Sequence, residues 1–205
     1  AITKFSKFHF VSNEVYRKRV IQLGENPKNV FNVGSTSPEN IQKEKTLRKS
    51  ELEKVIDFKF KERNFLITYH PSSYEKDFGL NNLRILLKVL SKFNNFGIIF
   101  TMPNSDIKNN DFFSLIKKFV KKNKNSKYFS SLGRRKYFSC IAHSNVIIGN
   151  SSSGIIEVPN FKKPTLNLGK RQKGRLLSKS IINCEKVTKK KLLKLIKRSI
   201  SSNFQ

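Results

Sequence analysis

The sequence has no tryptophan, one methionine and two cysteines among its 205 residues. Two cysteines are too few for a disulfide framework, and Cys140 and Cys184 do not show the spacing of metal ligands. We therefore expect reduced, partly buried thiols. No apolar run approaches the roughly 20 residues that a membrane-spanning helix needs, and the residues after Ala1 lack the layout of a signal peptide. The sequence predicts a cytoplasmic protein without a membrane partner.

Acidic residues are also scarce, with 14 Asp and Glu against 42 Lys and Arg, for a formal net charge of +28. Such an excess attracts polyanions, so a basic nucleic-acid-binding module is one alternative. However, the lysines are spread along nearly the whole chain, together with many Asn, Ile and Phe residues, as a strong A+T coding bias produces. Because no basic stripe alternates with exposed aromatic residues, we interpret most of this charge as solvated helix faces and do not expect nucleic acid as the partner.

Short apolar runs alternate with longer segments whose apolar residues recur at helical spacing. Runs such as 65–67 and 146–148 are continuously apolar, which is typical of strands covered by helices on both faces. The pattern predicts an α/β fold, a Rossmann-like parallel sheet with helices on both faces. The predicted strands are His9–Ser12, Val30–Val33, Phe65–His70, Gly97–Met102, Lys127–Ser130, Asn145–Gly149, Thr165–Leu168 and Ile181–Asn183.

The first sixty residues have a different pattern from the rest of the chain. A predicted helix over 14–25 is followed by a short strand, a polar segment and a charged helix around 46–56. We interpret residues 1–60 as the end of a preceding domain, a linker and the start of the next domain. The Rossmann-like domain is then expected over residues 61–205.

Ligands of open α/β sheets bind beyond the carboxyl ends of the strands, so the residues that follow each strand are site candidates. The turn 150–154, Asn-Ser-Ser-Ser-Gly, joins a buried strand to a predicted helix. Small residues let backbone N–H groups and hydroxyls approach an anion, and a helix N-terminus adds partial positive charge. The turn is therefore a candidate phosphate cradle, with Glu157, about a turn and a half into the helix, as a hydrogen-bond acceptor for a ribose diol. The alternative is a helix capped by serine, with Glu157 as a partner of the helix dipole.

The loop 169–175, Gly-Lys-Arg-Gln-Lys-Gly-Arg, directly follows another predicted strand. Its cations are suited to neutralising a diphosphate, and Arg171 is the better candidate because a guanidinium matches phosphate oxygens. A solvated basic loop is the alternative, and it fits Lys173 better than Arg171.

Further candidates follow other predicted strands. His70 ends a strand before a proline, where it can reach phosphate, although a lone histidine more often has a structural role. Asn104 and Asp106 are placed to contact a sugar or base, or to begin an Asx turn. Tyr137 is a candidate to stack on a base, with core packing as the alternative. The sequence shows no paired acid and base carboxylates, Walker lysine motif or metal-ligand cluster, so it predicts binding without an evident reaction centre.

These motifs, in this order, resemble the UDP-N-acetylglucosamine 2-epimerase family, most closely its hydrolysing branch, which feeds sialic and related nonulosonic acid synthesis. The resemblance covers nearly the whole chain, and the pairing of the turn 150–154 with Arg-Gln-Lys-Gly-Arg at 171–175 is specific to that branch. It implies a GT-B-like fold of two Rossmann-like domains, of which this chain is the C-terminal, UDP-binding half. The family's acid and base carboxylates lie mainly in the N-terminal domain, so no catalytic residue is expected here. That domain and the closing C-terminal helix are expected to be missing from the chain.

Carried over position by position, the resemblance implies a role for six residues and a secondary role for five more. The six are Ser151 and Ser152 on the diphosphate, Glu157 on the ribose, Arg171 on the phosphates, His70 on the phosphate or sugar, and Asn104 near the nucleotide. The secondary candidates are Asp106, Tyr137 against the uracil, Ser153, Gly154 and Arg175.

For the parent enzyme, the resemblance implies elimination of UDP from UDP-N-acetylglucosamine and addition of water, which gives N-acetylmannosamine and free UDP. It implies no metal or nicotinamide cofactor, and it implies a homo-oligomer for the full-length parent. The sugar, and whether it is linked to UDP or GDP, stay open. A nucleotide-sugar-binding domain of a glycosyltransferase is the alternative within the same fold.

Overall fold

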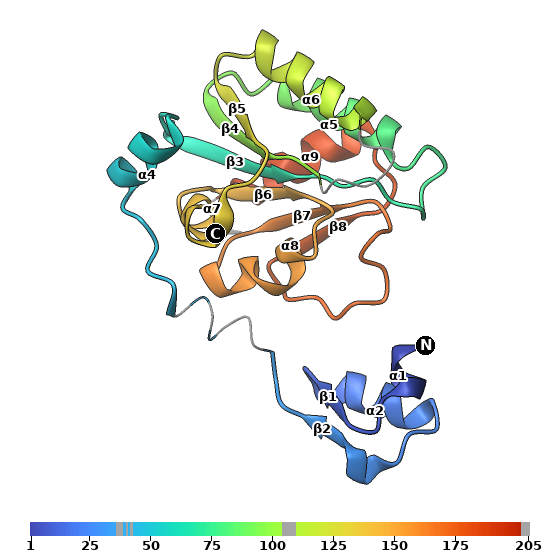
Figure 1. Ribbon diagram of the computed structural model, residues 1–205. Helices are drawn as coiled ribbons and strands as arrows, with labels where there is room; N and C mark the ends of the chain where they lie inside the picture. Colours follow the sequence, from blue (N-terminus) through green and yellow to red (C-terminus); the bar gives the residue numbers. More distant parts are fainter. Residues whose placement is uncertain (36–38, 40, 42, 104–109, 202–205) are drawn as a thin grey trace. The chain divides into compact units, whose positions relative to one another are not determined.

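The computed structural model describes residues 1–35, 39, 41, 43–103 and 110–201 (Figure 1). The chain divides into two compact units, Ala1–Lys43 and Glu44–Gln205. No helix in the described part of the chain is long and apolar enough to cross a membrane.

The larger unit contains a parallel, six-stranded sheet in the order β5-β4-β3-β6-β7-β8. The strand order reverses between β3 and β6, which is the topological switch point at which open α/β sheets bind ligands. All the strands predicted for this unit are present. They are β3 (Arg63–Thr68), β4 (Phe96–Thr101), β5 (Ser126–Phe129), β6 (Val146–Gly149), β7 (Thr165–Leu168) and β8 (Ile181–Cys184).

Helices cover both faces of this sheet (Figure 1). On one face lie α5 (Leu80–Leu90), α6 (Asn110–Lys122) and α9 (Lys189–Ser199); on the other lie α4 (Lys49–Ile56), α7 (Gly133–Ala142) and α8 (Ser153–Ile156). The apolar side of α5 places Leu83, Leu86 and Leu90 against buried strand residues, each with no exposed surface. Burying one such leucine contributes about 2 kcal/mol to the free energy of folding. Because helices cover both faces of the sheet, the central strands are apolar on both faces.

The division between the units falls before α4, inside the segment 1–60 that is predicted to hold a linker and the start of this domain. The segment before α4 is hydrogen-bonded to α7 and its C-terminal end. The Leu47 N–H donates to Ser139 Oγ at 2.9 Å, and His143 Nε2 lies 2.9 Å from Leu47 O. Leu52 of α4 is completely buried. These contacts make α4 part of the larger unit.

The helix predicted after the turn 150–154, from here on called the serine turn, is short. α8 spans only Ser153–Ile156 and is followed by a 3-10 helix over Val158–Phe161. Pro159 accounts for this, because it has no N–H to donate and restricts the residue before it. Glu157, predicted about a turn and a half into this helix, is instead its C-cap, the residue at which α8 ends. So short a helix adds little dipole to an anion site.

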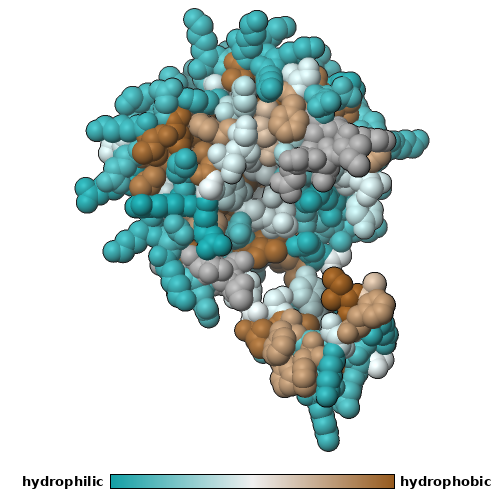
Figure 2. All heavy atoms as spheres, viewed as in Figure 1, coloured by the Kyte–Doolittle hydropathy of each residue, from teal (hydrophilic) through white to brown (hydrophobic). Residues whose placement is uncertain are grey.

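The smaller unit includes the helices α1 (Ile2–Phe5) and α2 (Glu14–Gln22), and a 3-10 helix over Pro27–Asn29. Its two predicted strands are present as β1 (His9–Val11) and β2 (Val30–Asn32), which pair in parallel. Large apolar side chains of this unit are exposed, and Figure 2 shows a hydrophobic patch on the face in view. The exposed fractions are 84% for Ile2, 89% for Phe5, 68% for Phe10 and 61% for Val33.

Candidate functional site

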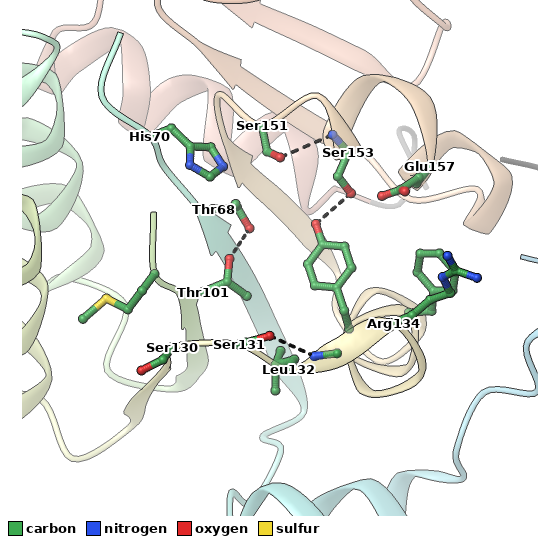
Figure 3. A pocket seen from close by; sticks show the side chains of 14 residues that line it. Thr68, His70, Thr101, Ser130, Ser131, Leu132, Arg134, Ser151, Ser153 and Glu157 are labelled. Carbon is green, nitrogen blue, oxygen red and sulfur yellow. Dashed lines mark hydrogen bonds between the residues drawn. The ribbon is translucent and has the colours of Figure 1, made fainter. Parts of the chain in front are cut away.

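A pocket of about 370 Å³ lies at the carboxyl ends of the central strands, in the size range of small-molecule sites (Figure 3). Residues that end or follow β3, β4, β5 and β6 form its walls, together with residues of α7. They are Thr68 and His70; Thr101 and Met102; Ser130, Ser131 and Leu132; Ser151, Ser153 and Glu157; and Gly133, Arg134, Tyr137 and Phe138. The pocket therefore lies at the switch point of the sheet and is rich in hydroxyl groups.

Two threonine hydroxyls meet in this pocket. Thr68 Oγ1 and Thr101 Oγ1 are 2.7 Å apart, and Figure 3 shows the pair between the neighbouring strands. Strand register explains this contact, because Thr68 and Thr101 end β3 and β4 and are paired directly. Neither threonine is among the site residues predicted from the sequence, although both lie near predicted strand ends.

Two serines of the turn, Ser151 and Ser153, line the same pocket. Ser151 Oγ accepts a hydrogen bond from the Ser153 N–H at 3.3 Å, and Ser153 Oγ accepts from the Tyr137 O–H at 2.8 Å (Figure 3). Ser152 holds the N-cap position of α8 but makes no side-chain cap hydrogen bond. The serine hydroxyl that accepts from the first N–H of α8 is that of Ser151, one residue before the N-cap.

Tyr137 connects α7 to the serine turn. Burial raises the pKa of its phenol, and the neighbouring Glu157 carboxylate raises that pKa further, against the lowering effect of hydrogen bonds to Ser153 and Thr68. The phenol stays protonated at neutral pH and can donate to Ser153. Tyr137 and the neighbouring Phe138 both line the pocket, and Phe138 is the more buried of the two, with 4% of its surface exposed.

Asn150 bonds to both main-chain groups of His70. The His70 N–H donates to Asn150 Oδ1 at 2.7 Å, and Asn150 Nδ2 donates to His70 O at 2.8 Å. His70 is half-buried and lines the pocket, so the end of β3 is held against the start of the serine turn.

The basic loop after β7 reaches the same asparagine. Arg171 Nη1 donates to Asn150 O at 3.0 Å, and Gln172 Nε2 donates to the same oxygen at 2.8 Å. Gln172 is 4% exposed, whereas Lys173 is exposed on the loop surface. The structure thus separates Arg171, which is tied to the serine turn, from the solvated Lys173.

The structure brings most of the predicted site residues together. His70, Ser151, Ser153, Glu157 and Tyr137 line one pocket. Ser152 and Gly154 belong to its serine turn, and Arg171 is bonded to the first residue of that turn. Arg175 lines a separate cavity of about 80 Å³. Asn104 and Asp106 lie outside the described residues.

Sequence reasoning missed Arg134, Asn150 and Gln172 as site residues. Arg134 lies in the first turn of α7, which the sequence analysis did not delimit, and lines the pocket. Asn150 and Gln172 belong to the two selected motifs, but their hydrogen-bond partners are remote in the sequence. Among the described residues, no group of three or more His, Cys, Asp or Glu side chains is placed to hold a metal ion.

A family model described as UDP-N-acetylglucosamine 2-epimerase matches residues 1–205. A hydrolysing GDP/UDP-N,N'-diacetylbacillosamine 2-epimerase of Campylobacter jejuni is 41% identical over 186 residues, covering 90% of this chain and 48% of the relative. Polysialic acid biosynthesis protein P7 of Escherichia coli is 40% identical over 184 residues, covering 89% of this chain and 46% of the relative. The chain therefore spans about half the length of the curated relatives it matches.

Solved structures show the same fold. The Methanocaldococcus jannaschii UDP-GlcNAc 2-epimerase in complex with UDP-GlcNAc and UDP matches with a TM-score of 0.72 and 18% identity, covering 98% of this chain and 56% of that one. The S. aureus MnaA–UDP co-structure matches with a TM-score of 0.73 and 14% identity, covering 98% and 53%. The Rossmann-like parallel sheet predicted from the sequence is confirmed, and it matches half of a GT-B-like enzyme. By its family-model match over the whole sequence, the chain belongs to the UDP-N-acetylglucosamine 2-epimerase family.

Proposed function

We propose that this chain is the nucleotide-sugar-binding half of a hydrolysing 2-epimerase. The parent enzyme converts UDP-N-acetylglucosamine, or a close derivative, to the N-acetylmannosamine form and free UDP. The observation that carries this proposal is the meeting of three strand ends at the switch point of the sheet. His70, the serine turn and Arg171 come from β3, β6 and β7 and are joined through Asn150.

The pocket residues, together with Ser152 and Gly154 of the serine turn and Arg171 of the basic loop, match the parts of a nucleoside diphosphate. Ser151, Ser152 and Arg171 supply hydroxyl and guanidinium donors for the diphosphate, and His70 lies beside them for phosphate or sugar. Glu157 supplies a carboxylate acceptor for the ribose diol. Tyr137 supplies an aromatic wall for the uracil, with its protonated phenol held on Ser153. Ser153 and Gly154 complete the turn.

The chain is expected to bind without turnover. Among the described residues that line the pocket, Glu157 is the one carboxylate, and elimination of UDP followed by addition of water needs both acid and base groups. We place those groups in the other half of the parent enzyme. Arg175 is an outer contact in this proposal, because it lines the neighbouring small cavity.

Calorimetric titration of UDP into the folded 205-residue chain tests the binding function. The expected result is a saturable heat at or below millimolar UDP, with weaker binding of UMP because UMP lacks the second phosphate. The nucleotide sugar is expected to bind without forming N-acetylmannosamine. Absence of heat at millimolar UDP, with circular dichroism showing a folded chain, would contradict the proposal.

We further propose that residues 1–43 belong to the end of a preceding domain. Two paired strands are too few for a stable sheet by themselves, and Phe5 and Phe10 expose 89% and 68% of their surface. Such exposed apolar surface is typical of a part of a larger domain that packs against the rest of that domain. The cytoplasmic location of the parent belongs to the same proposal, and the free, buried thiols of Cys140 and Cys184 support it.

Sequencing the DNA upstream of the Ala1 codon tests this arrangement. We expect an in-frame extension that encodes a second Rossmann-like domain with acidic residues at its strand ends. An in-frame stop codon immediately before Ala1, in DNA free of sequencing errors, would contradict it.

A further inference from the structure

Asn150 continues the pairing of β3 and β6 beyond the point where their main chains separate. Thr68 of β3 and Gly149 of β6 are the last paired residues, and the Asn150 N–H donates to Thr68 O at 3.1 Å. From here the main chain turns away into the serine turn. The side chain of Asn150 replaces the lost strand partner, because its amide carries the same N–H donor and C=O acceptor as a peptide group. It bonds to both His70 main-chain groups, at 2.7 and 2.8 Å.

The main chain of Asn150 serves the third strand end. Its carbonyl oxygen accepts from Arg171 Nη1 at 3.0 Å and from Gln172 Nε2 at 2.8 Å. Asn150 itself is 2% exposed. One buried residue therefore connects the ends of β3, β6 and β7, which carry His70, the serine turn and Arg171.

The geometry requires an asparagine side chain at this position. A carboxylate of the same shape lacks the N–H that reaches His70 O, and it would bury a charge. A glutamine is one methylene longer and would displace His70 from the turn, and displacements of about 1 Å can cost a site about 100-fold in function.

We propose that Asn150 is a positioning residue, which fixes His70 relative to the serine turn and Arg171 so that their donors converge on one anionic ligand. This role rests on the proposed nucleotide-binding function of the pocket. It predicts that loss of the Asn150 amide weakens nucleotide binding even though Asn150 does not line the pocket among the described residues.

Asn145 provides a matched control at the opposite end of the same two strands. Its Oδ1 accepts from the Asn64 N–H at 2.8 Å, and its own N–H donates to Asn64 O at 2.8 Å. Asn150→Ala and Asn145→Ala therefore each remove an asparagine side chain that joins β6 to β3. Only Asn150 lies at the carboxyl ends of the strands.

The experiment compares these variants of the full chain by UDP calorimetry and by hydrogen exchange of the His70 amide. Asn150→Ala is expected to weaken UDP binding by about tenfold, while Asn145→Ala stays within about twofold of the wild type. The His70 amide is expected to exchange faster in Asn150→Ala than in Asn145→Ala, because only the former loses its acceptor. Asn150→Asp keeps that acceptor but loses the donor to His70 O, and it is expected to remain weak in UDP binding.

Equal UDP affinities in Asn150→Ala and Asn145→Ala would overturn the positioning role. If Asn150→Ala does not fold, Asn150→Ser and Asn145→Ser are compared in the same way. If the wild-type chain binds no UDP, only the proposed nucleotide-binding function is contradicted. The hydrogen bonds between the Asn150 side chain and the His70 main chain are still tested, because exchange of the His70 amide is measured without ligand. Unchanged exchange of the His70 amide in the Asn150 variant would show that the Asn150 side chain does not hold His70.

Discussion

Replacing Gly149 with alanine is expected to lower the free energy of unfolding of the larger unit by about 3 kcal/mol or more. Gly149 has a φ of 150°, and a Cβ built on it would lie 1.9 Å from the Thr68 carbonyl oxygen. That oxygen belongs to the neighbouring strand at the centre of the sheet, so it cannot move without disturbing the pairing of β3 and β6. Urea unfolding followed by circular dichroism measures the effect.

Gly133→Ala is the matched control for this substitution. Gly133 also has a positive φ, 66°, but among the described residues no heavy atom outside its chain neighbours and its own helix backbone lies within 4 Å of the position that a Cβ would take. Its replacement tests the backbone strain alone, which costs about 1 kcal/mol. A Gly149→Ala variant no less stable than Gly133→Ala would contradict the proposed clash with Thr68. A Gly149→Ala chain recovered only in insoluble form is the extreme of the expected result.

The close packing of Gly149 against Thr68 also shows why parts of this fold could be predicted from the sequence and others could not. The strands of the sheet were identified because runs such as 146–148 are continuously apolar, which reflects burial on both faces. The close approach of Gly149 to Thr68 depends on which strands are neighbours. Sequence order alone does not give that pairing, because β3 and β6 are separated by two other strands along the chain.

The length of α8 was predictable in principle. Pro159 stands two residues after Glu157, and a proline disfavours helical geometry in the residue before it. The sequence analysis, which expected Glu157 about a turn and a half into the helix, did not use this signal. The observed four-residue helix keeps the serine turn but shifts the binding argument from the helix dipole to hydroxyl groups and to Arg171.

The candidate site was predicted as a set of strand ends, but its internal connections were not. His70, the serine turn and Arg171 were selected because each follows a predicted strand. The connections through Asn150 span 80 residues to His70 and 21 residues to Arg171. Side-chain hydrogen bonds over such separations leave no periodic pattern in a single sequence.

Arg171→Ala is expected to weaken UDP binding by about 10- to 150-fold, which corresponds to the roughly 1.5–3 kcal/mol of a hydrogen bond to a charged group. Arg171 is half-buried, and its bond to Asn150 O holds the guanidinium beside the serine turn. A guanidinium placed in advance loses little side-chain entropy when it binds a diphosphate, and its planar donors match the phosphate oxygens. Calorimetric titration of UDP into wild type and variant measures the loss.

Two substitutions separate this contact from the general positive charge of the protein. Lys173→Ala removes one charge from the same loop, and because Lys173 is exposed, UDP affinity is expected to change by less than about twofold at 0.15 M salt. Arg171→Lys keeps the charge but not the planar donors, so it is expected to recover only part of the affinity. Uridine, which has no phosphate, is expected to bind wild type and Arg171→Ala alike. An equal loss in Lys173→Ala and Arg171→Ala would assign binding to the net charge of +28 and contradict a built diphosphate site.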